Sequence, residues 1–125
     1  MKLENQVVSL ELSKRLKDLG FEQKSLWWYE VYDEGGSCEK ISILSKAIEG
    51  DYHQKYSAYT VAELGEMLPR TFKTENRMYI LKIDKFADEF AITYFSDGKA
   101  KTVQSDNEAN ARAEMLIWLK ENKYL

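Results

Sequence analysis

The fold is decided by FAITYFSDGKAKTVQSDNEANARAEMLIWLKENK, residues 90–123. This stretch begins with two segments, Phe90–Phe95 and Ala100–Gln104, whose aromatic and β-branched residues are typical of strands. Between them, Asp97 and Gly98 predict a type I′ turn, which requires a positive φ at both central residues. The sequence therefore predicts an antiparallel hairpin that leads directly into a helix.

The helix after this hairpin is expected to run from about Asp106 to Lys123. Ser105 can cap it while Glu108 returns a hydrogen bond to the cap, which is the arrangement of a capping box. At about 100° per residue, the helix carries two apolar stripes on nearly opposite sides. One stripe consists of Ala109, Ala113, Leu116, Ile117 and Tyr124, and the other of Ala111, Met115 and Trp118.

A second helix with two apolar faces is expected from about Glu4 to Leu19, before Gly20. Because a helix that lies on a sheet needs one apolar stripe, two stripes indicate either a third layer or contact with another subunit. We expect a homo-oligomer built through the terminal helices. The alternative is that the segment Ser45–Ser57 covers the second stripes within one chain. The two faces of the first helix are Val8, Leu12, Leu16 and Leu19, and Leu3, Val7 and Leu10.

Three more strands and one helix are expected between the terminal helices. Leu26–Tyr32 and Ile41–Leu44 have strand composition on either side of a glycine-containing turn, and Arg77–Ile83 is a further strand. A short helix is expected between Thr60 and Pro69. The predicted order is α-β-β-α-β-β-β-α, an α+β fold in which an antiparallel sheet is flanked by N-terminal and C-terminal helices.

The opening of the middle helix resembles the first half of a helix-turn-helix. Thr60 and Glu63 form a capping box, and the apolar residues after them give the helix one buried face. A recognition helix with basic or amide residues would have to follow. Pro69 instead ends the helix and the chain changes to strand composition, so we do not expect this motif.

Length, net charge and cysteine content limit the classes of protein to which this chain can belong. Residues 1–125 are enough for a single domain with a real core, and the net charge of −3 argues against a protein that binds duplex DNA. The segment Arg70–Lys85 carries five basic and two acidic residues, which suggests either a local anion site or a solvated surface. A lone cysteine, Cys38, and the lack of an apolar run of about 20 residues predict a cytoplasmic protein that does not enter a membrane.

The sequence contains few of the residues that catalytic and metal sites require. Cys38 and His53 are the single residues of their kinds, in no metal-binding spacing and with no activating neighbour in the sequence. No glycine-rich phosphate loop precedes a helix. We therefore expect neither an enzyme nor a metal or cofactor site.

A small anion is the ligand that the remaining residues suit best. Arg112 lies near the N-terminal end of the last helix, where the helix dipole also favours anions. Aromatic residues of the predicted strands could stack on a base, while polar residues of the hairpin accept hydrogen bonds from sugar hydroxyls. The alternative is that the aromatic residues belong to the core and Arg112 pairs with a surface carboxylate. The candidate ligand residues are Arg112, Phe86, Asp97, Ser96, Tyr94, Phe90 and Arg77.

Three segments, MKLENQVVSLELSKRLKDLGFEQKSLWWYE, YSAYTVAELGEMLP and EANARAEMLIWLKENKYL, resemble a family of small phage- and prophage-encoded proteins. The order of elements is also similar to that of the Thoeris anti-defence sponge family. That resemblance implies an oligomeric, non-enzymatic protein that sequesters cyclic ADP-ribose isomers. It also implies that Phe86 stacks on the base of the ligand, that Asp97 forms hydrogen bonds with its polar groups and that Arg112 holds its phosphate.

The expected function is thus a phage-encoded anti-defence protein that sequesters a small nucleotide-derived signal in the cytoplasm of an infected or lysogenic host. The alternative is a phage accessory protein that binds a host protein through an aromatic surface such as Leu26–Tyr32.

Overall fold

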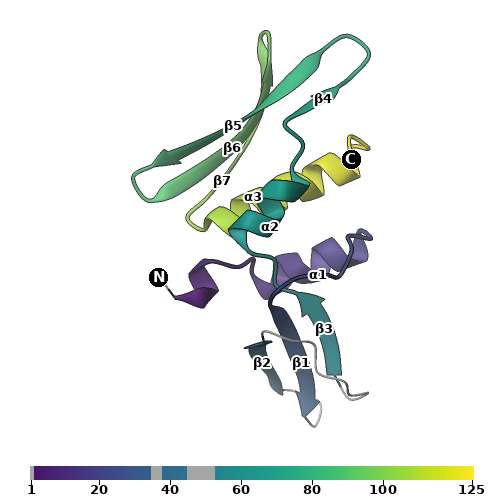
Figure 1. Ribbon diagram of the computed structural model, residues 1–125, viewed down its shortest axis with the longest axis vertical. Coiled ribbons are helices and arrows are strands. Elements are labelled where there is room, and N and C mark those ends of the chain that lie inside the picture. The colour runs from purple at the N-terminus through teal and green to yellow at the C-terminus, as the bar shows by residue number, and fades with distance from the viewer. Residues whose placement is uncertain (1, 35–37, 45–52) are drawn as a thin grey trace.

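The computed structural model describes residues 2–34, 38–44 and 53–125, and the side chains of residues 32–34, 38–44, 53 and 54 lie outside its description. The chain forms two antiparallel sheets with helices between them (Figure 1). The elements are the 3-10 turn η1 (Leu3–Asn5), α1 (Leu10–Asp18), β1 (Trp28–Glu34), β2 (Cys38–Leu44), β3 (His53–Ser57), α2 (Val61–Met67), β4 (Thr71–Lys73), β5 (Met78–Phe86), β6 (Glu89–Ser96), β7 (Lys99–Ser105) and α3 (Glu108–Glu121).

The predicted α+β class is confirmed, with helices at both ends of the chain. The predicted single sheet is wrong, because the strands divide into a small sheet of order β2-β1-β3 and a large sheet of order β4-β5-β6-β7. Two strands were not foreseen. β3 lies in the segment Ser45–Ser57, whose residues 45–52 are outside the description, and β4 has only three residues.

The hairpin of the opening stretch is present, and Ser96 pairs with Lys99 around the turn. Gly98 has a φ of 75°, but Asp97 is not among the residues with positive φ. The turn is therefore not of type I′, which needs both. One side of the hairpin lies on the helices, since Ile92 and Tyr94 are completely buried, and the other side faces outward with Phe95 39% exposed.

The helices form a middle layer between the two sheets (Figure 1). α3 packs on β6 and β7 on one side and on α1 and α2 on the other. Most of both apolar stripes is consequently covered within one chain, by the large sheet on one side and by α1 and α2 on the other, while Trp118 stays partly exposed and Tyr124 is 38% exposed. The buried part of the stripes therefore gives no reason to expect an assembly. The buried residues of α3 are Ala109, Ala111, Ala113, Met115, Leu116, Ile117 and Leu119.

The first helix is shorter than predicted. It begins at Leu10 because Ser9 caps it, with the Ser9 hydroxyl accepting from the Leu12 N–H at 3.3 Å. Val7, expected on a helix face, lies in extended chain and forms a β-bridge with Thr60. Leu3, Val7 and Leu10 pack against Tyr29 and neighbouring residues of the small sheet, so this second face is also covered within the chain.

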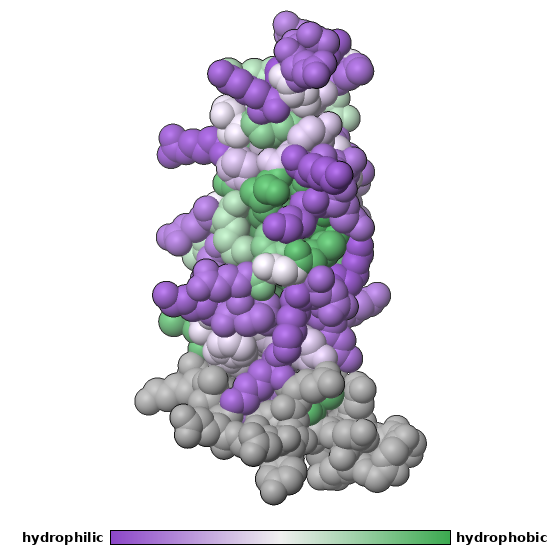
Figure 2. Space-filling model, turned by 90° about the vertical axis from the view of Figure 1, so that its right-hand side faces the viewer, coloured by the Kyte–Doolittle hydropathy of each residue, from purple (hydrophilic) through white to green (hydrophobic). Residues whose placement is uncertain are grey.

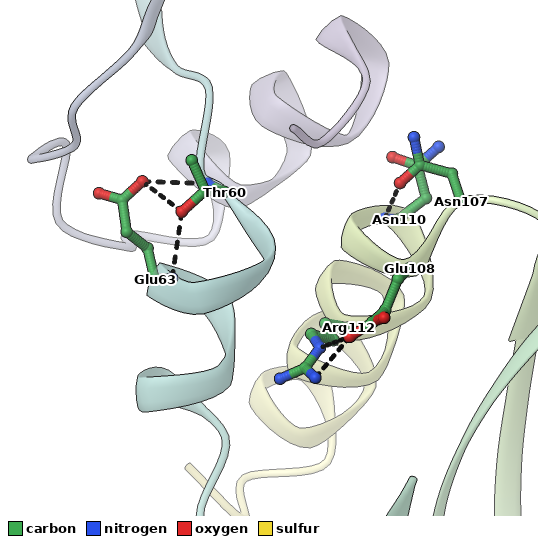
Figure 3. Close-up of polar contacts among 6 residues, drawn as sticks. All are labelled: Thr60, Glu63, Asn107, Glu108, Asn110 and Arg112. Atoms are coloured by element: carbon green, nitrogen blue, oxygen red, sulfur yellow. Dashed lines mark hydrogen bonds and ion pairs between the residues drawn. The ribbon is translucent and has the colours of Figure 1, made fainter. Parts of the chain in front are cut away.

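Side-chain caps define the starts of α2 and α3, and a further contact ties α3 to α1. The predicted capping box of α2 is confirmed, with Glu63 accepting from the Thr60 N–H at 3.0 Å (Figure 3). For α3 the prediction is wrong by two residues, because Asn107 caps the helix by accepting from the Asn110 N–H at 3.0 Å (Figure 3). The side-chain oxygen of Asn110 accepts from the Ser9 N–H at 2.8 Å and so joins the starts of α1 and α3.

After α2 the chain enters the strand β4 and not a second helix, so this segment is not a helix-turn-helix.

Candidate functional site

The seven predicted ligand residues do not meet at one place. Register places Phe86 and Phe90 at one end of the β5–β6 pair, where Phe86 pairs with Glu89, and Phe95 at the other end opposite Ile80. Tyr94 lies in the core and Arg112 lies between α2 and α3. The single anion site expected around Arg112 is therefore not formed. Three predicted residues do come together at the hairpin end, namely Arg77, Ser96 and Asp97.

Arg112 is held within the middle layer. Its guanidinium donates from Nε and Nη2 to the Glu108 carboxylate at 2.9 and 2.5 Å, one helical turn earlier (Figure 3). The other terminal nitrogen, Nη1, lies where a Cβ on Gly65 of α2 would collide with it. The ion pair is partly buried, with 15% of the Arg112 side chain exposed. Arg112 therefore acts in the packing of α2 on α3.

Tyr94 belongs to the core, as the alternative interpretation predicted. It is fully buried, and its hydroxyl donates to the Pro69 carbonyl at 2.6 Å. Burial raises the pKa of the Tyr94 phenol well above its usual range, because the charged form would lose its hydration. The group stays neutral and serves as a hydrogen-bond donor.

The cations of Arg70–Lys85 are spread over different surfaces of β4 and β5. Lys82 lies 3.5 Å from Asp84, and Lys85 lies over the Phe90 ring at 5.6 Å from its centroid. Arg77, by contrast, lines a hollow. The basic segment does not form a single anion site.

That hollow, named here the outer hollow, has a volume of about 550 Å³ and opens on the outward face of the large sheet. Arg77 is held at its edge, because Nη1 donates to the backbone carbonyl of Asp97 across the hairpin. A guanidinium has four further N–H groups, so this contact fixes its position without exhausting its donors. The lining residues are Asn76, Arg77, Met78, Ile80, Phe95, Ser96 and Asp97.

The outer hollow combines the groups that a sugar phosphate requires. Arg77 can hold a phosphate, and the Asp97 carboxylate and Ser96 hydroxyl can accept from sugar hydroxyls. Phe95 and Ile80, which are 39% and 45% exposed, supply an apolar surface for a base. Its volume falls in the range of small-molecule sites, roughly 300–1,000 Å³.

A second hollow, named here the aromatic hollow, lies on the helix side of the same hairpin. It measures about 470 Å³, and its lining includes Tyr79, Gly98, Lys99, Lys101, Trp118 and Tyr124. Sequence reasoning placed none of them in a ligand site. Trp118 and Tyr124 were assigned to apolar stripes, because the sequence does not show that α3 ends beside β7. A usable signal was the pair Lys99 and Lys101, whose alternation predicts that both point to the same side of the strand.

A third hollow of about 350 Å³ lies beside α2. Glu22, Glu63 and Glu66 are among its lining residues. Three carboxylates disfavour an anion, so this hollow does not fit the ligand that the sequence suggested.

The fold and the hollows define a class: a small α+β domain that offers a ligand-sized hollow on each side of one β-hairpin. No family model, curated protein or solved structure matches this chain. Among the described residues, no three His, Cys, Asp or Glu side chains gather as metal ligands, and the side chains of Cys38 and His53 lie outside that description. In the same part of the chain, none of the helices is both long and apolar enough to cross a bilayer.

Proposed function

We propose that the chain is a phage-encoded cytoplasmic protein that sequesters a nucleotide-derived signal of the cyclic ADP-ribose class without catalysis. The observation that supports this proposal is the composition of the outer hollow. Arg77, Asp97 and Phe95 bring a guanidinium, a carboxylate and an aromatic ring to one hollow of about 550 Å³. A cyclic ADP-ribose isomer carries phosphates, sugar hydroxyls and a purine, and each finds a complementary group there.

In this proposal Arg77 binds the phosphate, a role that the sequence suggested for Arg112. The Arg112 guanidinium is engaged by Glu108 and packed against α2, whereas Arg77 stands at an open surface. The polar roles of Asp97 and Ser96 remain as expected. Phe95 takes the stacking role that was expected of Phe86, which lies at the far end of β5.

Ligand retention tests the proposal directly. The purified protein is incubated with each cyclic ADP-ribose isomer, desalted and heated, and the released compound is quantified by mass spectrometry. We expect the unchanged isomer to be recovered in near-stoichiometric amount from the parent protein. Arg77→Gln should lower recovery at least tenfold, because the phosphate loses its charge-assisted hydrogen bonds.

Arg15→Gln is the matched control, since Arg15 is half exposed on α1, makes an ion pair of 3.7 Å with Glu121, and neither residue lines the outer hollow. It should retain ligand as the parent does. The proposal fails if the parent retains no isomer, or if both arginine variants retain it equally. Recovery of a converted product would instead indicate an enzyme.

The second candidate, a protein that binds a host protein, is favoured by the outward face of the large sheet. Met78, Ile80, Phe86 and Phe95 are between 39% and 56% exposed there, which is unusual for large apolar side chains on one face. The segment Leu26–Tyr32 is a poorer candidate, because Tyr29 and Val31 within it are only 7% and 8% exposed. Absence of ligand retention together with capture of one host protein would favour this function.

A further inference from the structure

We propose that the aromatic hollow is a second binding site, separate from the outer hollow, for a planar aromatic group that carries a negative charge. The aromatic hollow lies between the C-terminal end of α3 and the strand β7. The inference is independent of the function proposed above, because the two hollows share no lining residue.

The rings of the aromatic hollow are held in place before any ligand arrives. Phe72 is buried and stacks between Tyr79 at 4.8 Å and Tyr124 at 4.6 Å, measured between ring centroids. Trp118 lies 5.5 Å from Tyr124. Rings fixed by mutual stacking lose little conformational freedom when a further planar group binds, so they form a preorganised surface. A volume of about 470 Å³ admits one fused ring system with its substituent.

The charge of the aromatic hollow selects an anion. Lys99 and Lys101 both line it, and none of the described lining residues is acidic. The outer hollow differs in this respect, because it contains the Asp97 carboxylate. A ligand recognised by its ring and its negative charge therefore suits the aromatic hollow, while the outer hollow also offers an acceptor for sugar hydroxyls.

Aromatic cages in other proteins also recognise organic cations. Here Lys101 already places its ammonium over the Trp118 ring, 5.6 Å from the centroid. A cationic ligand would have to displace Lys101 and would then meet two positive charges. An anion faces no such repulsion, and the geometry favours it.

The existing contact of Lys101 does not prevent anion binding. A cation–π contact at a partly exposed site is weaker than a hydrogen bond between two charged groups. Replacing the contact between Lys101 and Trp118 by a hydrogen bond from Lys101 to an anion is therefore favourable, and it frees the Trp118 face for stacking.

The C-terminal end of α3 lies at the right of Figure 1, and Leu125, which follows Tyr124, is 45% exposed. Figure 2, which views the molecule from that side, shows hydrophobic residues gathered at the height of α2 and α3 with hydrophilic residues around them. The lining of the aromatic hollow consists mainly of tyrosine, tryptophan and lysine, which that colour scale does not show as hydrophobic, so this area is distinct from the hollow.

The test is calorimetry with two matched pairs of probes. 2-Naphthoate and its neutral amide separate charge from ring shape, and adenosine 5′-monophosphate and adenosine do the same for a nucleotide. We expect both anions to bind at least fivefold more tightly than their neutral partners, and more weakly as salt increases. Tighter binding of naphthoate than of the monophosphate would identify aromatic carboxylates as the ligand class, and the reverse would identify nucleotide phosphates.

Lys101→Gln should weaken binding of both anions at least fivefold. Lys120→Gln is the matched control, because Lys120 lies over the Phe21 ring at the same 5.6 Å and is not among the lining residues. Melting temperatures of both variants verify that they fold. Arg77→Gln should leave naphthoate affinity unchanged, which separates this site from the outer hollow. The proposal is overturned if neither anion binds, if the neutral probes bind equally well, or if both lysine variants behave alike.

Discussion

At the scale of single residues, the neighbours of a side chain decided its role more than its chemistry did. Arg112 has the chemistry of a phosphate ligand, yet its guanidinium bonds Glu108 and packs against Gly65. Trp118 was expected at a subunit interface, yet it lines a hollow beside Lys101. For Trp118 the deciding contact comes from another element of the fold, whereas for Arg112 it comes both from Glu108, four residues earlier on α3, and from Gly65 of α2.

The contact between Arg112 and Gly65 leads to the first prediction. Gly65→Ala in an otherwise unchanged chain places a Cβ against Nη1 of Arg112. The whole guanidinium must then move, and its hydrogen bonds to the Glu108 carboxylate are disturbed. In a chain that already carries Arg112→Ala, the same change should stabilise the fold by about 1 kcal/mol, because alanine is the better helix former.

We therefore expect the two changes to be coupled by about 1 kcal/mol in a double-mutant cycle of urea denaturation. Equal effects of Gly65→Ala in the two backgrounds would show that the guanidinium does not contact α2.

At the scale of elements, α3 shows how burial on two sides overrides the usual pattern of a helix. An amphipathic surface helix has one apolar stripe, but α3 lies between the large sheet and the helices α1 and α2. Its start is defined by the polar contacts of Asn107 and Asn110, which also tie it to Ser9. The start of α3 thus depends on its own cap and on Ser9, and its position on the large sheet and the two other helices.

The second prediction concerns the cap of α3. Asn107→Ala should destabilise the fold by about 1 kcal/mol, because the Asn110 N–H loses its acceptor. Ser105→Ala should cost less, since its hydroxyl accepts from the Asn107 N–H ahead of the helix rather than from the helix itself. Thermal unfolding of the two variants compares them, and a larger loss for Ser105→Ala would restore the cap that the sequence suggested.

At the scale of the whole molecule, the layers account for the apolar surface that suggested an oligomer. Met115, on the second stripe of α3, is completely buried within one chain, as is Val7 of the N-terminal segment. A homo-oligomer through the terminal helices stays a prediction, but the stripes no longer support it.

The third prediction separates these two interpretations. If Met115 is a core residue, Met115→Glu buries an unpaired carboxylate and should destabilise the chain by about 3 kcal/mol or more. If it were an interface residue, the variant would be a folded species of lower mass. Circular dichroism with light scattering distinguishes the outcomes, and we expect loss of folded protein rather than a change of mass alone.

The sequence determined what depends on local chemistry. The hairpin of the opening stretch, the capping box of Thr60 and Glu63 and the end of α2 shortly before Pro69 all follow from residues within a few positions of one another. The division of the strands into two sheets and the burial of both stripes depend on segments far apart in the chain. Periodicity reports that a face is apolar, but it does not report what covers that face.

The candidate sites divide in the same way. Arg77, Ser96 and Asp97 were named from the sequence, and the antiparallel register of β5 and β6 brings them to one hollow. The aromatic hollow could not be named, because its residues come from β5, β7 and the end of α3. Its rings and lysines become neighbours only when α3 lies across the large sheet, so tertiary packing alone decided that site.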